Sequence, residues 1–470
     1  MRVLLLMPPY IAGFSRSARW EGVQISGSWW YPIYLAYCTG LLEQGGHETK
    51  LIDAPAAEIT HEDTFRIVRE FSPQLTVLNF SIKSLDNDLK VAAKIHELTG
   101  SEIILVGPSA YFDSVDTLKK SEVVKYLAKG EYDFTVRELA DGMSLENIKG
   151  LFWKNSKGEI VENPPREPVT GEQLDMFPFV TDVYRRHLNI KNYRQSCHPY
   201  PFVDLFTGRG CAWGKCTFCF WPHTINKGVG YRTRNISNVI EELRFIKEEM
   251  PYIKEVYLQD DTLPKERAQE LSEAILDNKL KIRWSCYSRA TLDFETMKLM
   301  KKAGCHILET GFESHNQEIL NNIKKGITVA GAEEYIKNAR KAGLEVIGAF
   351  ITGLPGETPE TIRETTEWAR KLPCLRYTVE ITRPYPGTPL YQWLEEHGCM
   401  KDEKPNYPNL SPEDIYRLNK WSLNRIFFSP NYLCRILTKP GVWGSVLYSA
   451  KHYLPYVFNR KKSDETELGW

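Results

Sequence analysis

The chain has 470 residues with equal numbers of basic and acidic side chains, 60 Lys or Arg and 60 Asp or Glu, so its formal net charge at pH 7 is zero. This balance disfavours nucleic acid as the default partner, and no apolar run reaches the length of a transmembrane helix. The length predicts two or three domains. The apolar start is too short for a signal peptide, so the 10 cysteines are expected in the reducing cytoplasm.

Residues 1 to about 140 alternate short apolar runs with amphipathic stretches, which predicts a parallel sheet with helices on both faces. The predicted strands are Val3–Met7, His47–Asp53, Leu75–Phe80 and Glu102–Val106. The predicted helices are Tyr34–Gln44, Glu62–Phe71 and Asp86–Thr99. Ligands of such sheets bind at the carboxyl ends of the strands. No glycine-rich dinucleotide fingerprint or P-loop is present, so a different ligand and a scaffold without a cofactor both stay open.

A loop with three cysteines in nine residues follows the predicted strand Phe202–Thr207. The cysteines are Cys211, Cys216 and Cys219. Three thiolates from one loop can bind three irons of a [4Fe–4S] cluster and leave the fourth iron open for a substrate or cosubstrate. A structural zinc site normally has four nitrogen or sulfur ligands; His223 is a candidate fourth, but no second Cys-x-x-Cys pair follows. The loop favours the cluster over zinc and over unconnected thiols.

Strands and helices keep alternating from about residue 200 to 400. Helices are predicted at Asn238–Glu249 and Lys265–Asp277, and strands at Glu255–Leu258, Lys281–Tyr287, Ile307–Thr310, Leu344–Ile351 and Arg376–Ile381. About six β/α units of this kind predict an incomplete barrel, with its site at the carboxyl ends of the strands.

The end of the chain has an unusual composition. From Ile415 through Ser463 it contains no Asp or Glu, but nine Lys or Arg interleaved with aromatic and apolar residues. This mixture suits a membrane interface. The alternative is a helical cap that buries the aromatic side chains against the barrel.

The order of motifs in the second domain resembles that of cobalamin-dependent radical S-adenosylmethionine (SAM) enzymes. After the cysteine loop come Tyr-Leu-Gln-Asp-Asp at 257–261, Trp-Ser-Cys-Tyr-Ser-Arg at 284–289, Glu-Thr-Gly-Phe-Glu-Ser at 309–314, Gly-Ala-Phe-Ile-Thr-Gly-Leu-Pro-Gly-Glu-Thr at 348–358 and Arg-Pro-Tyr-Pro-Gly-Thr-Pro-Leu at 383–390. One departure from the family is that four residues, instead of three, separate the first two cysteines. Gly214 is expected to absorb the extra residue because glycine tolerates unusual backbone angles.

The first domain ends like a cobalamin-binding domain placed ahead of a radical SAM domain. The segments that carry this resemblance are Ile103–Ala110 and Leu127–Leu139. Pro108 replaces the second glycine of the family's V-G-G, and Asp133 replaces the second acid of its G-E-x-E-x-T-x-x-E-L. The cobalamin motif D-x-H-x-x-G is absent, so we expect no histidine on the lower face of cobalt. The available histidines are His47, His61 and His96.

Shorter segments resemble the hopanoid-associated branch of the family, which neighbours the anaerobic magnesium-protoporphyrin cyclases. They are Thr217–Thr224, Tyr231–Arg234, Trp30–Pro32 and Leu51–Pro55. The whole resemblance implies an α/β protein with a Rossmann-like, flavodoxin-like cobalamin-binding domain over residues 1–140 and a linker over 141–200. A partial (β/α)6 radical SAM barrel over 201–400 and a helical C-terminal tail over 401–470 follow.

The resemblance also implies the residues of each cofactor site. Cys211, Cys216 and Cys219 would bind the [4Fe–4S] cluster. The predicted SAM-binding residues are Phe218, Asp260, Arg289, Glu313, Ile351 and Gly353. The predicted cobalamin-binding residues are Pro8, Pro9, Tyr10, Ser81, Ile82, Gly107, Pro108, Gly130 and Glu131. The structural alternatives are a helix N-cap for Asp260, a surface salt bridge for Arg289, an ion pair for Glu313 and core packing for Ile351.

The implied reaction starts when the reduced cluster passes one electron to SAM, which yields a 5′-deoxyadenosyl radical. The expected substrate is large and apolar, a hopanoid-like lipid or a tetrapyrrole, and it is cyclised, rearranged or C-methylated. The alternatives are a C-methyltransferase for a secondary metabolite or peptide and a non-catalytic sensor of cluster and cobalamin. A reductant such as flavodoxin or ferredoxin is the expected partner in the cytoplasm, and residues 415–463 are the candidate membrane contact.

Overall fold

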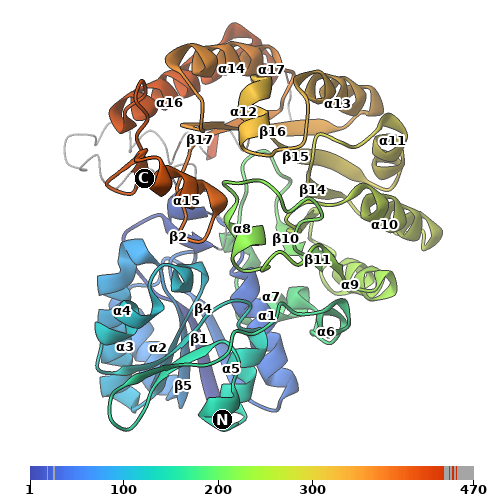
Figure 1. The fold of residues 1–470 in the computed structure, drawn as a ribbon. Helices are drawn as coiled ribbons and strands as arrows, with labels where there is room; N and C mark the ends of the chain where they lie inside the picture. The colour runs from blue at the N-terminus through green and yellow to red at the C-terminus, as the bar shows by residue number, and fades with distance from the viewer. Residues whose placement is uncertain (18–19, 25–26, 439–443, 445–446, 449–450, 452–470) are drawn as a thin grey trace. The chain divides into compact units, whose positions relative to one another are not determined.

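The computed structural model describes residues 1–17, 20–24, 27–438, 444, 447–448 and 451. This part of the chain forms two compact units (Figure 1). The first is built from Met1–Gln195 and Thr224–Lys227, and the second from Ser196–His223 and Gly228–Lys451. Each unit has its own parallel sheet.

The first unit is built on a seven-stranded sheet in the order β4-β1-β5-β6-β7-β8-β9. The parallel strands are β4 (Glu48–Asp53), β1 (Arg2–Met7), β5 (Leu75–Asn79), β6 (Glu102–Val106) and β7 (Val124–Ala128), and the antiparallel ones are β8 (Leu151–Lys154) and β9 (Ile160–Glu162). The five parallel strands stand in the order 2-1-3-4-5, which is the flavodoxin-like order. The predicted fold of this unit is confirmed. Its ligand crevice is expected where β1 and β5 meet at their carboxyl ends.

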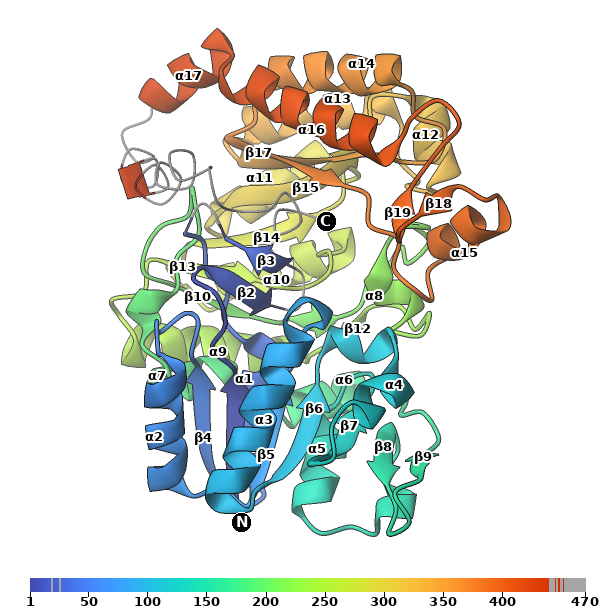
Figure 2. The same cartoon turned by 90° about the vertical axis from the view of Figure 1, so that its left-hand side faces the viewer.

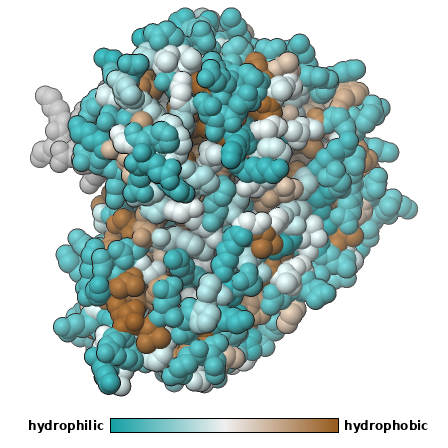
Figure 3. All heavy atoms as spheres, viewed as in Figure 1, coloured by the Kyte–Doolittle hydropathy of each residue, from teal (hydrophilic) through white to brown (hydrophobic). Residues whose placement is uncertain are grey.

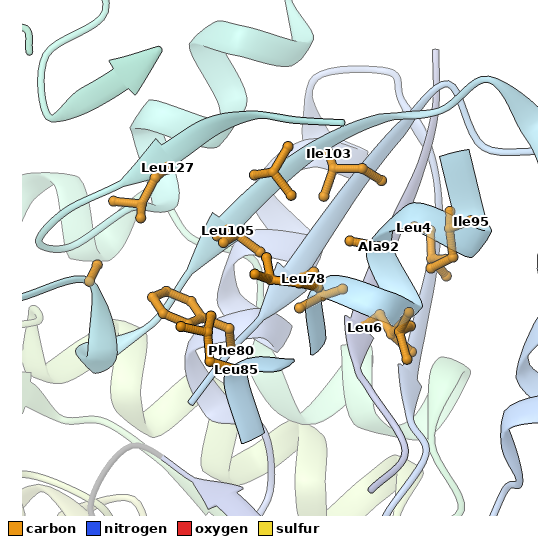
Figure 4. Packing of buried hydrophobic residues seen from close by; sticks show 14 of the residues in the cluster. Leu4, Leu6, Leu78, Phe80, Leu85, Ala92, Ile95, Ile103, Leu105 and Leu127 are labelled. Atoms are coloured by element: carbon orange, nitrogen blue, oxygen red, sulfur yellow. The ribbon is translucent and has the colours of Figure 1, made fainter. Parts of the chain in front are cut away.

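Helices cover both faces of this sheet. α2 (His61–Phe71), α3 (Leu85–Thr99) and α4 (Ser114–Lys119) lie on the face toward the viewer of Figure 2. α1 (Ile33–Gln44), α5 (Asp133–Ala140) and α7 (Val180–His187) pack together on the other face. Buried side chains between the sheet and α3 include Leu4, Leu6, Leu78, Leu105, Ala92 and Ile95 (Figure 4). Burial of such side chains contributes about 25 cal/mol per Å² of apolar surface and holds the layers together.

A buried ion pair anchors the hairpin of β2 (Phe14–Ser17) and β3 (Trp20–Val23), which follows β1. Arg16 donates from Nη2 to Asp88 Oδ1 of α3 at 2.7 Å and from Nη1 to the carbonyl of Pro8 at 2.5 Å. The loop after β5 donates further hydrogen bonds to Asp88. The pair therefore ties the hairpin to the carboxyl ends of β1 and β5.

Most of residues 141–200, which the sequence predicts as a linker, belong to the first unit. β8 and β9 extend its sheet as a hairpin, and α6 (Gly171–Asp175) and α7 follow. The unit therefore runs to Gln195 instead of residue 140. The two strands have only 4 and 3 residues, which is too short for a visible period in the sequence.

The second unit is a partial barrel whose six parallel strands follow one another in chain order (Figure 1). They are β10 (Phe202–Leu205), β13 (Glu255–Leu258), β14 (Trp284–Ser288), β15 (Cys305–Glu313), β16 (Glu345–Thr352) and β17 (Arg376–Ile381). The helices that connect and cover them are α9 (Ile236–Glu249), α10 (Lys265–Asp277), α11 (Phe294–Lys302), α12 (Gln317–Asn322), α13 (Val329–Ala342), α14 (Pro359–Lys371) and α15 (Pro389–Glu396). The predicted partial barrel is confirmed. Its carboxyl strand ends carry the cysteine loop and the family motifs.

Two further helices, α16 (Pro412–Phe427) and α17 (Pro430–Leu437), pack at the edge of this sheet beside β17 and α14. Ile415 is fully buried in the apolar cluster beneath α16. Tyr432 of α17 packs edge-on against Tyr377 at 5.5 Å between ring centres. The side of α16 and α17 that faces the barrel therefore packs as the helical cap that was predicted from the sequence as the alternative to a membrane contact.

The outer side of the same helices stays exposed. Trp421 is 36% and Phe428 is 73% exposed. On the face that Figure 3 shows, the surface is mainly hydrophilic and apolar residues gather in a few small patches. None of the described helices is long and apolar enough to cross a membrane. Most of the predicted tail after residue 438 lies outside the described residues.

A buried polar cluster lies at the amino ends of the barrel strands. His198 Nδ1 is 3.1 Å and His306 Nε2 is 3.3 Å from Glu255 Oε1. Burial lowers the pKa of His306 to about 4. The folded protein therefore holds this imidazole in its neutral form at neutral pH.

Acidification is expected to destabilise the barrel through His306. The unfolded chain takes up this proton near pH 6.5 and the folded chain only near pH 4, so the stabilisation is complete above pH 6.5 and is lost as the pH falls toward 4. The loss is on the order of 3 kcal/mol. Denaturant unfolding at a series of pH values measures it. His306→Gln should flatten the decline, and an equally steep decline in this variant would contradict the assignment.

Candidate active site

The cysteine loop starts where two short strands hold the backbone close together. β11 (Gly208–Arg209) pairs with β12 (Arg232–Thr233). A Cβ on Gly208 would lie 2.6 Å from the Tyr231 ring, and one on Gly210 would lie 2.5 Å from a backbone carbonyl. Only glycine leaves room for the two strands to lie this close together, so Gly208 and Gly210 fix the direction in which the loop leaves the barrel.

The three cysteines of the loop are free thiols. Cys216 is 9% exposed, while Cys211 and Cys219 are partly exposed. Burial raises the pKa of Cys216, and the charges of Lys325 and Arg289 act in the opposite direction. Iron binds cysteine as the thiolate, which nearby positive charge stabilises. The net effect is a raised pKa, and burial raises the pKa of Cys219 as well, so the bound iron itself would have to stabilise these thiolates.

The described residues offer no site for a single zinc ion. In the described part of the chain, no three His, Cys, Asp or Glu side chains are grouped so that they could hold a single metal ion. Each cysteine of a [4Fe–4S] cluster binds a different iron, so the sulfurs lie farther apart than the ligands of one ion. His223, the candidate fourth zinc ligand, instead lies 2.9 Å through Nε2 from the carbonyl of Cys216. The imidazole braces the loop.

The additional residue between the first two cysteines is accommodated as predicted. Gly214 has a φ of +61°, in the left-handed region where glycine is least strained. Trp213 beside it donates from Nε1 to the carbonyl of Lys324 at 2.9 Å. The longer loop thus gains a second point of attachment.

Asp260 is buried just after β13 and holds the start of the cysteine loop. Its Oδ1 accepts from the backbone N–H of Thr207 at 2.7 Å, and its Oδ2 accepts from the hydroxyls of Thr207 and Tyr231. Burial raises the pKa of Asp260. The N-cap of α10 is Pro264, so the alternative role of Asp260 as that cap is wrong. With both oxygens engaged, contact with the methionine amine of SAM stays a prediction.

Arg289, Glu313 and Lys325 come together beside the cysteine loop. Glu313 Oε1 lies 2.6 Å from Lys325 Nζ, and Arg289 Nη2 donates to the carbonyl of Lys325 at 2.6 Å. The Arg289 guanidinium also lies 4.6 Å from the centre of the Trp213 ring. Backbone carbonyls and the indole of Trp213 therefore hold Arg289 in place. Glu313 forms an ion pair with Lys325, which is the structural role that was predicted from the sequence as the alternative to SAM binding.

Glu313 has a backbone conformation that is uncommon for a residue with a side chain. Its φ is +64°, at the point where the register between β15 and β16 shifts. Gly311 makes room for it, because a Cβ there would lie 2.2 Å from the Glu313 carboxylate and 3.0 Å from Lys325 Nζ. Strain of this kind costs about 1–3 kcal/mol and concentrates at functional sites. This geometry supports the predicted role of Glu313 in binding SAM.

The other predicted SAM residues lie at the end of β16 and in the loop. Phe218 packs against the apolar cluster that contains Ile415. Ile351 is half-buried on β16. Gly353 has a φ of +85°, and its N–H donates to Glu357 Oε2 at 2.6 Å. Their contact with the adenine of SAM is untested and stays a prediction.

The carboxyl edge of the first sheet brings together most of the predicted cobalamin residues. Pro8, Pro9 and Tyr10 follow β1, Ser81 and Ile82 follow β5, and Gly107 and Pro108 follow β6. β5 is hydrogen-bonded to both β1 and β6. The predicted residues thus surround the crevice that this strand order creates.

Two features of this edge fit a ligand with amide and apolar groups, such as a corrin. Asn79 Oδ1, at the end of β5, is buried without a hydrogen-bond partner. Gly107 has a φ of +120°, and a Cβ there would lie 3.2 Å from the Asn79 side chain. An amide N–H of the ligand would satisfy this orphaned oxygen. Exposed apolar side chains at the same edge are Ile11, Ile82, Phe112 and Val115.

Gly130 and Glu131, predicted to bind cobalamin, follow β7. Glu131 is buried, and its Oε2 accepts from the backbone N–H of Val169 at 2.6 Å. Gly130 has a φ of +99°. These contacts serve the packing of the unit, and a role toward cobalamin is untested.

The three histidines considered for cobalt are engaged elsewhere. His47 Nε2 lies 2.7 Å from Asp141 Oδ1, and His96 Nδ1 lies 2.9 Å from a backbone carbonyl just before β6. His61 Nε2 lies 2.9 Å from Asn87 Oδ1. A cobalt lower face without histidine stays a prediction.

Sequence reasoning missed Lys325, Trp213 and Asn79. Lys325 gives no local signal, because its importance depends on contacts with segments far away in the chain. Asn79 interrupts the apolar run Leu75–Phe80, and a polar residue at the end of a buried strand was a usable signal.

Comparison with known proteins identifies the family. The model of the radical SAM superfamily matches residues 205–369. An uncharacterized methyltransferase from Pyrococcus horikoshii is 31% identical over 410 residues, which cover 85% of this chain and 84% of that protein. The chain belongs to the radical SAM superfamily. It is therefore a radical SAM enzyme, and the predicted recognition is confirmed.

Other relatives fall in the predicted branch. An anaerobic magnesium-protoporphyrin IX monomethyl ester cyclase from Cereibacter sphaeroides is 26% identical over 89% of this chain and 68% of its own length. A hopanoid C-3 methylase from Methylococcus capsulatus is 25% identical over 76% of this chain and 67% of its own length. The solved structure of the radical SAM methyltransferase TsrM from Kitasatospora setae, with cobalamin and a [4Fe–4S] cluster bound, matches with a TM-score of 0.65 and 19% identity over 89% of this chain and 81% of that one. The chain shares the fold of that cobalamin-binding enzyme.

Proposed function

We propose that this protein is a cobalamin-dependent radical SAM enzyme that methylates, cyclises or rearranges its substrate at an unactivated carbon. The observation that carries the proposal is the three-cysteine loop at the carboxyl end of a radical SAM barrel, in one chain with a flavodoxin-like sheet. Cys211, Cys216 and Cys219 would hold a [4Fe–4S] cluster. When bound and reduced, this cluster supplies the electron that cleaves the carbon–sulfur bond of SAM.

The side chains around the loop prepare a site for SAM. Arg289 and Lys325 place positive charge where the methionine carboxylate of SAM can pair. Glu313 offers a carboxylate to the ribose hydroxyls, and Asp260 fixes the backbone from which the cysteine loop starts. These residues would hold the methionine and ribose groups of SAM beside the cysteine loop.

In the first unit, the carboxyl edge of the sheet would hold cobalamin. Asn79 would accept a hydrogen bond from a corrin amide, Gly107 would let the macrocycle approach the backbone, and the exposed Ile82 and Phe112 would cover its apolar surface. This assignment rests on the orphaned oxygen of Asn79 and on the likeness of the fold to that of TsrM.

The substrate class is inferred from the relatives. Their names record action on a magnesium porphyrin and on a hopanoid. We therefore propose an enzyme for a large, mainly apolar substrate. The second candidate function is a methyltransferase for a smaller metabolite or peptide. The relative that is similar over most of the chain is named a methyltransferase, which favours methylation and leaves the substrate open.

Anaerobic incubation of the reconstituted protein with cobalamin, SAM and a flavodoxin or ferredoxin reductant tests the function. Formation of 5′-deoxyadenosine is expected, whereas a non-catalytic sensor forms none. The mass of the product separates the reactions, because methylation adds one methylene and cyclisation or rearrangement does not. Absence of both 5′-deoxyadenosine and a methylated product would contradict the proposal.

We also propose that the outer side of α16 and α17 contacts a membrane surface. Trp421 and Phe428 are exposed, Lys420 directly precedes Trp421 in the chain, and no acidic residue follows Asp414 until after residue 463. Aromatic and basic side chains together bind the interface of anionic bilayers. α16 is part of the barrel packing, so point substitutions are a better test than deletion of this segment.

Flotation with vesicles of anionic and neutral lipid measures this contact. The double variant Trp421→Ser/Phe428→Ser is expected to bind anionic vesicles about tenfold more weakly than the wild type. Tyr252→Ser, at a residue that is 46% exposed on another part of the second unit, is the control. A wild-type protein that stays unbound, or equal binding of the double variant, would contradict the membrane contact.

A further inference from the structure

The turn Ile323–Gly326, between α12 and α13, is fastened to the cysteine loop at three points. The N–H of Thr217 donates to the first carbonyl of the turn at 3.0 Å. Trp213 Nε1 donates to the carbonyl of Lys324 at 2.9 Å. Gly326 lies against the indole, because a Cβ there would be 2.1 Å from the Trp213 ring. The turn and the loop therefore form one rigid element of the site.

This element places one buried ammonium group beside the cysteines. The side chain of Lys325 is only 11% exposed and pairs with Glu313 at 2.6 Å. Lys324, its neighbour on the same turn, is exposed. A buried lysine is costly unless it is paired. The turn that carries Lys325 is hydrogen-bonded to Thr217, the residue that follows Cys216 in the chain, so the ammonium group belongs to the element that holds this cysteine.

The opposing charge is held just as firmly. Glu313 has a left-handed backbone with φ +64°. Gly311 leaves the space in which the carboxylate and the Lys325 ammonium meet. Arg289 donates to the Lys325 carbonyl at 2.6 Å and so fixes the turn from a third side. Both charges thus have a fixed distance to the loop.

We propose that Lys325 is a positioning residue that sets the reduction potential of the cluster, with Glu313 as the opposing charge. The inference rests on the proposed function, because it needs a [4Fe–4S] cluster on the three cysteines. Reduction adds an electron, so a fixed positive charge stabilises the reduced cluster and a fixed negative charge destabilises it. The pair keeps the potential between the values that either charge alone would give.

Redox titration of the reconstituted full-length protein without SAM, followed by electron paramagnetic resonance, tests this role. Lys325→Gln is expected to lower the ratio of reduced to oxidised cluster at a fixed potential by about tenfold, which is 59 mV for a one-electron couple. Lys324→Gln is the matched control and should leave the ratio unchanged. Glu313→Gln should raise the ratio, and the double variant Lys325→Gln/Glu313→Gln should lie near the wild type.

The two single variants separate a charge effect from a structural effect. Both break the same ion pair, so a purely structural role would move the potential in the same direction in both. That outcome, or an unchanged potential in Lys325→Gln, would overturn the inference. If Lys325→Gln loses iron, Lys325→Arg takes its place: a wild-type potential supports the charge role, and a shifted one contradicts it. Iron analysis of the wild type comes first, because a wild type without a cluster means that the proposed function itself has failed.

Discussion

Replacing Cys216 with alanine is expected to leave the protein folded but without its [4Fe–4S] cluster, and to lower SAM cleavage by about a thousandfold or more. Cys216 is the least exposed of the three thiols, and its loop is held by Asp260, Trp213 and the Ile323–Gly326 turn. Two remaining thiolates leave two irons without a protein ligand, so the cluster is lost to solvent. Iron content, visible absorption and the yield of 5′-deoxyadenosine measure the effect.

The control for this experiment is another cysteine of the same unit. Cys434 on α17 is exposed, and Cys434→Ala should keep iron content and SAM cleavage at wild-type levels. Circular dichroism should show the same fold for both variants. A Cys216→Ala protein that keeps a full cluster would show that the iron ligands lie elsewhere in the chain.

Replacing Arg16 with methionine is expected to destabilise the first unit by about 3–5 kcal/mol, because it leaves the Asp88 carboxylate buried without its partner. Both side chains of the pair are at most 1% exposed, and burial already raises the pKa of Asp88. Hydrogen exchange of α3 and β5 should then quicken by a factor of roughly 10² to 10⁴. Cobalamin binding should weaken as well, because the pair holds the loops after β1 and β5.

Two further variants separate loss of the pair from loss of packing. Arg66→Met removes an arginine that is 60% exposed on α2, and its effect should stay below about 1 kcal/mol. Arg16→Met/Asp88→Asn removes both charges and should recover much of the stability. Equal exchange rates in Arg16→Met and in the wild type would contradict a role of the pair in stability.

The sheets of both units could be predicted from the sequence. Buried parallel strands appear as continuous apolar runs, and Leu75–Phe80 and Glu102–Val106 differ from β5 and β6 by at most one residue. The ends of the predicted strands then gave the residues at the carboxyl edge of the first sheet, and the cysteine loop after β10 in the second unit. The hairpin Leu151–Glu162 was missed because its strands are short and pair only in the folded sheet.

Much of the candidate site depends on contacts that a local pattern does not reveal. Lys325 reaches Glu313 from 12 residues away, and Trp213 reaches Lys324 from 111 residues away. Arg16 and Asp88 are 72 residues apart. A sequence motif marks which residues occur at a strand end, but the folded structure decides which of them touch. This is why Asp260 could be predicted at a strand end, whereas its hydrogen bonds to Thr207 and Tyr231 could not.

The most direct test of the account is electron–nuclear double resonance on the reduced enzyme with SAM that carries an isotopic label at the methionine nitrogen. Three cysteine ligands leave one iron open, so the labelled nitrogen should couple to the cluster when SAM binds. The coupling should be absent in Cys219→Ala. A wild-type cluster whose spectrum is unchanged by SAM would contradict the claim that this loop holds a cluster open to SAM.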